Sequence, residues 1–93
     1  MAMNYTRQTI TGDANHSGVT RFAGFSVREA AGSPAAATVN FRSATVGGQI
    51  LATIELAANE SAMVFFPGPI IASGGVYVEA AAGTISGVLY NGR

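Results

Sequence analysis

The sequence contains no cysteine and no lysine, and it has a single histidine. Without thiols the chain can form neither a disulfide nor a thiolate metal site, and a lone histidine excludes a structural zinc site. Without lysine, a glycine-rich phosphate-binding loop that depends on a lysine is excluded as well. These absences argue against most catalytic and metal-binding functions.

Charge is also scarce. Five arginines and five acidic residues make up 11% of the chain and give a formal net charge of zero. Balanced in this way, the arginines do not predict a basic patch, and we expect no nucleic-acid partner. A net charge near zero favours association. Arginine without lysine is typical of protein interfaces, although a GC-rich genome would produce the same bias.

The sequence shows neither a secretory signal nor a membrane-spanning segment. Residues 1–8 lack a charged start followed by an apolar run. No apolar stretch approaches the length needed to cross a bilayer. We therefore expect synthesis and folding in a cytoplasm, with no membrane partner.

One short segment brings together residue types that can be reactive, namely Asp13, His16 and Ser17. A nucleophilic triad needs a rigid scaffold and an oriented base, whereas these residues share a short loop flanked by glycines. The start of the loop has some likeness to a calcium loop, but no second carboxylate follows within reach. We expect a solvated turn here, and we expect no catalytic residue, no metal and no cofactor in this chain.

Residues 49–66 show the clearest strand pattern. Polar residues alternate with four apolar ones, Ile50, Ala52, Ile54 and Leu56. A period of two is typical of a half-buried strand. Residues 57–61 favour a turn, and the apolar segment 62–66 is followed by Pro67-Gly68-Pro69, which we expect to end it. The stretch predicts a β-hairpin or a corner where the chain crosses between sheets.

Two further pairs of strands are predicted to form hairpins. Residues 19–29 and 35–42 flank a loop that contains glycine and proline, and residues 76–81 and 84–90 flank Ala82-Gly83. In these runs the residues that we expect to face inward are Ala23, Phe25, Val27, Ala37, Val39, Phe41, Val76, Val78, Ala80, Ile85, Gly87 and Leu89.

Six or seven short strands at roughly ten-residue spacing predict an all-β fold, either a small antiparallel β-sandwich or a jelly-roll-like barrel. The alanine runs are too short, and too close to glycine or proline, to form helices. Residues 1–18 are polar and lack a clean alternation. We expect an extended N-terminal arm over residues 1–18, which includes a short edge strand or is instead a solvated, floppy tail, and a β-sandwich domain over residues 19–93.

Several large side chains fall where the alternation assigns solvent. Phe65 and Phe66 are adjacent, so in a strand they point to opposite faces. Two interpretations are open: these side chains cap the ends of the sandwich or lie under the N-terminal arm, or they form a patch that another subunit covers. Val88 falls on such a face as well. For a covered patch the candidate interface residues are Tyr5, Arg7, Ile10, Leu51, Met63, Phe65, Phe66, Tyr77, Tyr90 and Arg93.

Four parts of the chain resemble small β-rich structural proteins of tailed bacteriophages. They are residues 23–29 (AGFSVRE), residues 49–61 (QILATIELAANES), Phe66-Pro-Gly68, and residues 75–79 (GVYVE) with 83–87 (GTISG). The resemblance covers about residues 19–91. It implies a non-enzymatic capsid decoration (cement) protein on the virion surface, a homo-oligomer and usually a homotrimer, whose partner is the major capsid protein.

The resemblance also carries an expectation about the arm and leaves a second role open. Residues 1–18 would become ordered on the capsid lattice, so deleting residues 2–18 would abolish capsid binding while the domain stays folded. The second role is a tail or head-fibre component that binds a receptor or carbohydrate. In the absence of tryptophan, Tyr77 and Tyr90 would form its stacking platform. An enzyme ranks third.

Overall fold

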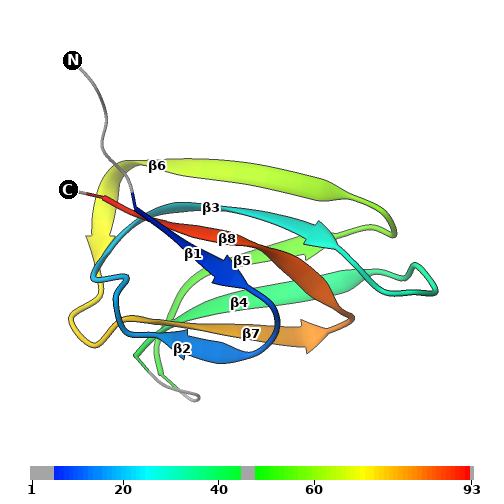
Figure 1. Ribbon diagram of the computed structural model, residues 1–93, viewed down its shortest axis with the longest axis horizontal. Coiled ribbons are helices and arrows are strands. Elements are labelled where there is room, and N and C mark those ends of the chain that lie inside the picture. The colour runs from blue at the N-terminus through cyan, green and yellow to red at the C-terminus, as the bar shows by residue number, and fades with distance from the viewer. Residues whose placement is uncertain (1–5, 45–47, 93) are drawn as a thin grey trace.

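The computed structural model describes residues 6–44 and 48–92, and Figure 1 shows them as two packed layers of strands. Within these residues the chain forms strands and no helix, so the all-β prediction is confirmed. The strands are β1 (Thr6–Ile10), β2 (Ala14–His16), β3 (Arg21–Glu29), β4 (Ala37–Ser43), β5 (Ile50–Leu56), β6 (Ser61–Ile71), β7 (Val76–Ala82) and β8 (Ile85–Asn91).

The strands form two antiparallel sheets. Sheet A has the order β1-β8-β3-β6, and sheet B has the order β2-β7-β4-β5. The pairs β1–β8, β2–β7, β3–β6 and β4–β5 are those of one long hairpin with β4–β5 at its tip. When that hairpin is rolled up, its successive pairs lie in alternate sheets. In sheet A, β8 then pairs with β3, and in sheet B, β7 pairs with β4. This connectivity is that of a jelly roll, which is an eight-stranded sandwich.

Six of the seven connections between successive strands pass from one sheet to the other. The predicted hairpins over residues 19–42 and 76–90 are therefore wrong, because β3 and β4, and likewise β7 and β8, lie in different sheets. Residues 49–66 form the sheet-crossing corner and not the hairpin. The physical reason is that the alternation of apolar and polar residues shows which side of a strand is buried. It does not show which other strand lies next to it in a sheet. A loop of a few residues can reach either an adjacent strand, about 5 Å away, or the facing sheet, about 10 Å away.

The predicted inward faces are confirmed for most strands. The side chains of Val39, Phe41, Val78 and Leu89 are completely buried, and Ala37, Phe25, Val27 and Ile85 are at most 3% exposed. Four of the five phenylalanines meet between the sheets. Phe41 of β4 lies 4.3 Å from Phe25 and 5.4 Å from Phe22, measured between ring centroids, and Phe66 packs edge-on against Phe22.

A bulge in β3 explains why Phe22 is buried although the alternation places it on the other face. Phe22 pairs with Asn91 and Gly24 pairs with Tyr90, so Ala23 is the extra residue on β3. A bulge shifts the side-chain alternation by one residue. Phe22 and Phe25 consequently both point into the core, where their rings are 6.2 Å apart.

Strand β6 continues through Pro67-Gly68-Pro69, where the sequence predicts its end. Gly24 pairs with Phe65 and Phe22 pairs with Ile70, so the Pro-Gly-Pro segment is accommodated as an irregularity in β6. Proline cannot donate a backbone hydrogen bond and is tolerated in edge strands. Because β6 lies at the edge of sheet A, the missing donors disturb no second neighbour.

The N-terminal residues that the structure describes are part of the sandwich. β1 pairs with β8 over Thr6–Ile10, and β2 pairs with β7 over Ala14–His16, so one edge strand is added to each sheet. The expected short edge strand is thus two strands, and the count rises from six or seven to eight. Ile10 and Val19 are completely buried. Ile10 therefore belongs to the core, and the prediction that it forms part of an interface surface is wrong for this chain.

The solvent-accessible surface of the chain is 5023 Å². Surface scaling predicts about 5,000 Å² for a folded monomer of this mass. The chain is thus packed as well as an ordinary small domain. The exposed large apolar residues, Ile50, Met63, Phe65 and Ile71, therefore do not reflect a loose core.

Candidate functional site

The outward side chains of sheet A form rows that cross its strands. Because paired residues of neighbouring strands share a face, the register defines this surface directly. From one end of the sheet to the other, the rows are Arg21 and Ile71; Arg7, Tyr90, Gly24 and Phe65; Thr9, Val88, Ser26 and Met63; and Ser86, Arg28 and Ser61. We call this surface the outer face of sheet A.

Apolar residues occupy two strands of this face, the edge strand β6 and the inner strand β8. Met63 is 63% exposed, Ile71 is 62% exposed and Phe65 is 47% exposed. Val88 and Tyr90 are half-buried beside them. Single exposed apolar residues are ordinary on protein surfaces, but a contiguous group that is rimmed by polar residues marks an interaction site.

Two aromatic rings stack across the middle row. The rings of Phe65 and Tyr90 lie 4.9 Å apart between centroids, at an interplanar angle of 27°. Gly24 lies between these two residues in the row, on the central strand β3. A Cβ atom at Gly24 would lie 2.1 Å from the carbonyl oxygen of Val64, so a side chain does not fit here. The bare backbone of β3 lets the two rings approach each other over it.

A shallow hollow of ≈ 270 Å³ lies at the end of the outer face of sheet A that is opposite Arg21 and Ile71. Arg28 is flanked there by its two cross-strand partners, Ser61 and Ser86. The hollow thus combines a guanidinium group with nearby hydroxyl groups, which are donors suited to an anionic or polar group. It is lined by Ser26, Val27, Arg28, Ser61, Ser86, Gly87 and Val88.

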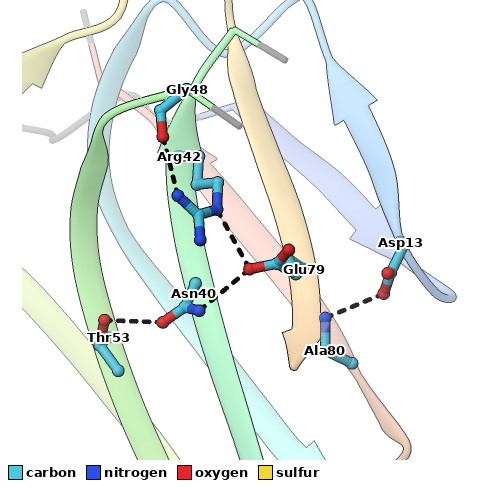
Figure 2. A network of polar contacts seen from close by, with 7 residues as sticks. All are labelled: Asp13, Asn40, Arg42, Gly48, Thr53, Glu79 and Ala80. Atoms are coloured by element: carbon cyan, nitrogen blue, oxygen red, sulfur yellow. Dashed lines mark hydrogen bonds and ion pairs between the residues drawn. The ribbon is translucent and has the colours of Figure 1, made fainter. Parts of the chain in front are cut away.

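The outer face of sheet B carries a polar network beside Ile50 and Tyr77, and Figure 2 shows the network. Glu79 accepts hydrogen bonds from Asn40 at 3.0 Å and from Arg42 at 3.1 Å, and Asn40 in turn accepts one from Thr53 at 2.8 Å. Arg42 also donates to the carbonyl oxygen of Gly48. These groups satisfy one another, so this face has less need of a partner than the outer face of sheet A.

The structure brings four of the predicted interface residues together on the outer face of sheet A. They are Arg7, Met63, Phe65 and Tyr90, and they come from three strands that are far apart in sequence. Val88, which the alternation also placed outward, lies among them. Reasoning from sequence missed Ile71. The adjacent Ile70 and Ile71 carry the same signal as Phe65 and Phe66, namely two large apolar neighbours that must point to opposite faces.

The other predicted interface residues that the structure describes do not join this face. Phe66 points inward and packs against Phe22, and Leu51 is partly buried against the core. Tyr77 pairs with Arg42 and Asn15, so it lies on the outer face of sheet B. Tyr77 and Tyr90 are therefore on opposite sides of the sandwich and cannot form one stacking platform. Tyr5 and Arg93 lie outside the described residues.

The loop and strand that contain Asp13, His16 and Ser17 have structural roles. The Asp13 carboxylate accepts a hydrogen bond from the backbone N–H of Ala80 at 2.9 Å, which ties the start of β2 to β7 (Figure 2). His16 pairs with the buried Val76, so its ring points toward the interior, and its Nε2 atom is buried with no hydrogen-bond partner among the described residues. Ser17 is exposed.

Glu29 is the buried carboxylate of the chain, at 5% exposure. It accepts hydrogen bonds from the backbone N–H groups of Asn59 at 2.8 Å and Ala31 at 2.7 Å. These bonds lower the pKa of Glu29, because they stabilise its charged form. Glu29 therefore fastens the β5–β6 corner to the end of β3, and its charge is used within the fold.

Stability should fall with acid in two stages. Burial lowers the pKa of His16 below its usual value, so the unfolded chain binds a proton first as the pH falls below about 6.5. Hydrogen bonds likewise lower the pKa values of Glu29 and Glu79, so their contribution is present above about pH 4.5 and is lost as the pH falls further. Urea unfolding of His16→Leu should lack the upper stage and keep the lower one. If the free energy of unfolding of His16→Leu and of the wild type changed equally between pH 7 and 5.5, His16 would be equally protonated in the folded and unfolded states.

Within residues 6–44 and 48–92 no cluster of three or more histidine and acidic side chains could hold a metal ion. The same residues include no helix that is long and apolar enough to span a membrane. The outer face of sheet A gathers apolar residues and arginines. These residue types are suited to binding another molecule by contact.

Comparison with known proteins found no match to a family model, to a curated protein or to a solved structure.

Proposed function

We propose that this protein is a non-enzymatic structural component of a tailed-phage virion, a capsid decoration protein that binds the shell of the major capsid protein. The observation that supports this most directly is the difference between the two outer faces. One carries Met63, Phe65 and Ile71 exposed to solvent, and the other carries a closed polar network. The class of protein that we propose, a phage structural protein, comes from the resemblance of residues 19–91 to such proteins.

In this proposal the outer face of sheet A is buried against the shell. Removing apolar surface from water stabilises the contact by about 25 cal/mol per Å², so a face of this size gives a modest affinity for one site. A shell offers many identical sites. Binding to the assembled, expanded shell and not to its separated subunits stabilises the shell by mass action. The protein would therefore act at the virion surface without any chemical step.

We also propose a homo-oligomer, most simply a homotrimer, on the shell. A ring of three copies requires that one patch of each copy contacts a different patch of its neighbour. The resemblance to decoration proteins, which are usually trimeric, is what supports this oligomer. The role as a receptor- or carbohydrate-binding fibre component is less favoured, because Tyr77 and Tyr90 lie on opposite faces.

Replacing the apolar residues of this face by polar residues of similar shape tests the proposal. The triple variant Met63→Gln, Ile71→Thr and Val88→Thr keeps residues that suit strands. We expect at least a tenfold loss of affinity for purified expanded shells of the major capsid protein, measured by co-sedimentation, because each change removes apolar contact area. The free energy of unfolding should change little, since these positions are exposed or half-buried on the outer face.

The matched control is Ile50→Thr, which changes an exposed isoleucine on the other sheet. It should leave shell binding intact. Wild-type protein that fails to sediment with shells, or a triple variant that binds as tightly as the wild type, would rule out this role for the outer face of sheet A.

A further inference from the structure

The outer face of sheet A carries three of the five arginines of the chain and no acidic residue. Arg7, Arg21 and Arg28 are all exposed. The rows of this face contain apolar residues, serines, a threonine and a glycine in addition. Within the described residues no hydrogen bond or ion pair engages the guanidinium groups of these three arginines, so their charges are available to a partner.

The arginines lie on strands that alternate with the apolar ones. Arg21 and Arg28 are seven residues apart on β3, which corresponds to about 23 Å along a strand. They lie at opposite ends of the face, and Arg7 lies on the edge strand β1. Val88 lies on β8, between β1 and β3, whereas Met63 and Phe65 lie on β6, on the far side of β3. Apolar residues interleaved with arginines are typical of protein–protein interfaces, where aromatic residues, methionine and arginine are enriched.

A second copy of the chain is a poor partner for this face. Two such faces packed together would bring six arginines into one interface with no carboxylate. The other surfaces of the chain offer little more, because most of its acidic side chains already have partners. Glu79 is paired with Arg42, Glu29 is buried, and Asp13 and Glu60 each accept a hydrogen bond from a backbone N–H group. Among the described residues, only Glu55 remains uncommitted.

We propose that the outer face of sheet A docks on a surface of a different protein that presents apolar side chains together with carboxylates. This deepens the proposed function, on which it rests, by naming the chemistry that the shell must present. The hollow beside Arg28 receives one of these carboxylates, because a guanidinium group and the hydroxyl groups of Ser61 and Ser86 can donate to it together. Self-association, where it occurs, uses another surface.

A protein surface fits this face better than a nucleic acid does. Three arginines in a chain of zero net charge supply a weak field for a phosphate backbone. Base stacking needs open aromatic faces, whereas the rings of Phe65 and Tyr90 already stack on each other. The most exposed apolar residues of the face, Met63 and Ile71, have no aromatic ring and offer no stacking surface.

Defined polymers test this chemistry with the full chain and without any capsid. A random copolymer of glutamate and tyrosine serves as the acidic, apolar probe, a copolymer of lysine and tyrosine reverses its charge, and a single-stranded thymidine oligonucleotide represents nucleic acid. We expect the glutamate copolymer to bind most tightly and to shift the amide NMR signals of the outer face of sheet A. The triple variant Arg7→Gln, Arg21→Gln and Arg28→Gln should weaken this binding about tenfold, as expected for three exposed ion pairs.

Glu55→Gln is the control, since it removes a charge from sheet B and should leave the affinity unchanged. Equal binding of the lysine copolymer, an unaffected triple arginine variant, or no binding of the glutamate copolymer would overturn the inference. Tighter binding of the oligonucleotide would replace it with a nucleic-acid site. Self-association that the triple arginine variant abolishes would make the partner a second copy.

The same variants separate this inference from the proposed function. If the glutamate copolymer binds in the expected way but shells do not bind, the decoration role fails and the chemistry of the face stands. If shells bind the wild type and the triple arginine variant equally well, the decoration role stands and the proposed pairing of these arginines with carboxylates is wrong.

Discussion

Replacing Phe41 with alanine is expected to remove about 3–5 kcal/mol from the free energy of unfolding. A domain of this length has roughly 5–14 kcal/mol in total, so this one change would remove a large part of it. Phe41 is the only phenylalanine that sheet B contributes to the core, and its ring stacks on Phe25 of sheet A at 4.3 Å. Truncating it would leave a cavity between the sheets. Urea unfolding followed by circular dichroism measures the loss.

The same substitution at Phe65 is the matched control. Phe65 lies on the outer face of sheet A and is 47% exposed. Its truncation opens no cavity in the core, and we expect a loss of at most about 1 kcal/mol, mainly from the stack with Tyr90. Equal losses at Phe41 and Phe65 would contradict the arrangement of the two sheets described above.

Deleting residues 2–18 is expected to prevent folding, which reverses the expectation drawn from the sequence. The deletion would remove β1 from sheet A and β2 from sheet B, and with them the completely buried Ile10. It would also leave one edge of β8 and one edge of β7 unpaired. A 93-residue domain has little stability to spare, so the shortened chain should give no cooperative unfolding transition and a poorly dispersed NMR spectrum.

A synthetic peptide of residues 6–18 provides the control for this deletion. Added in trans, it should restore NMR dispersion, because β1 and β2 are edge strands and each pairs with one neighbour. A shortened chain that stays folded without the peptide would show that residues 6–18 are dispensable to the sandwich. In that case the earlier expectation of a separable arm would return.

The character of each strand could be predicted from sequence because it is local. The alternation in residues 37–41 and 76–80 correctly assigns the inward faces, since a side-chain period of two follows from strand geometry alone. Local pattern failed where the backbone departs from that geometry. The extra residue Ala23 turned Phe22 inward, and the edge position of β6 let the strand continue through two prolines.

The candidate site was less predictable than the strands. Met63, Phe65 and Tyr90 could each be singled out as large side chains on an outward face, but nothing in the sequence indicated that they share a face with Arg7. Tyr77 carried the same signal and lies on the opposite side of the sandwich. Which residues share a face depends on which sheet each strand joins. The sequence pattern predicted that consecutive strands pair as hairpins, so it assigned several strands to the wrong sheet.

By itself, the sequence determined that this protein is all-β, which residues of its central strands are buried, and that it lacks the thiols and lysines on which much catalytic chemistry depends. The tertiary structure decided that most successive strands alternate between sheets, and so gathered Met63, Phe65 and Ile71 on one side with three arginines that have no partner among the described residues. The physical reason is that backbone hydrogen bonds between strands do not depend on side-chain identity. The choice of neighbour is therefore made by the packing of the whole core, in which Phe22, Phe25, Phe41 and Phe66 must meet.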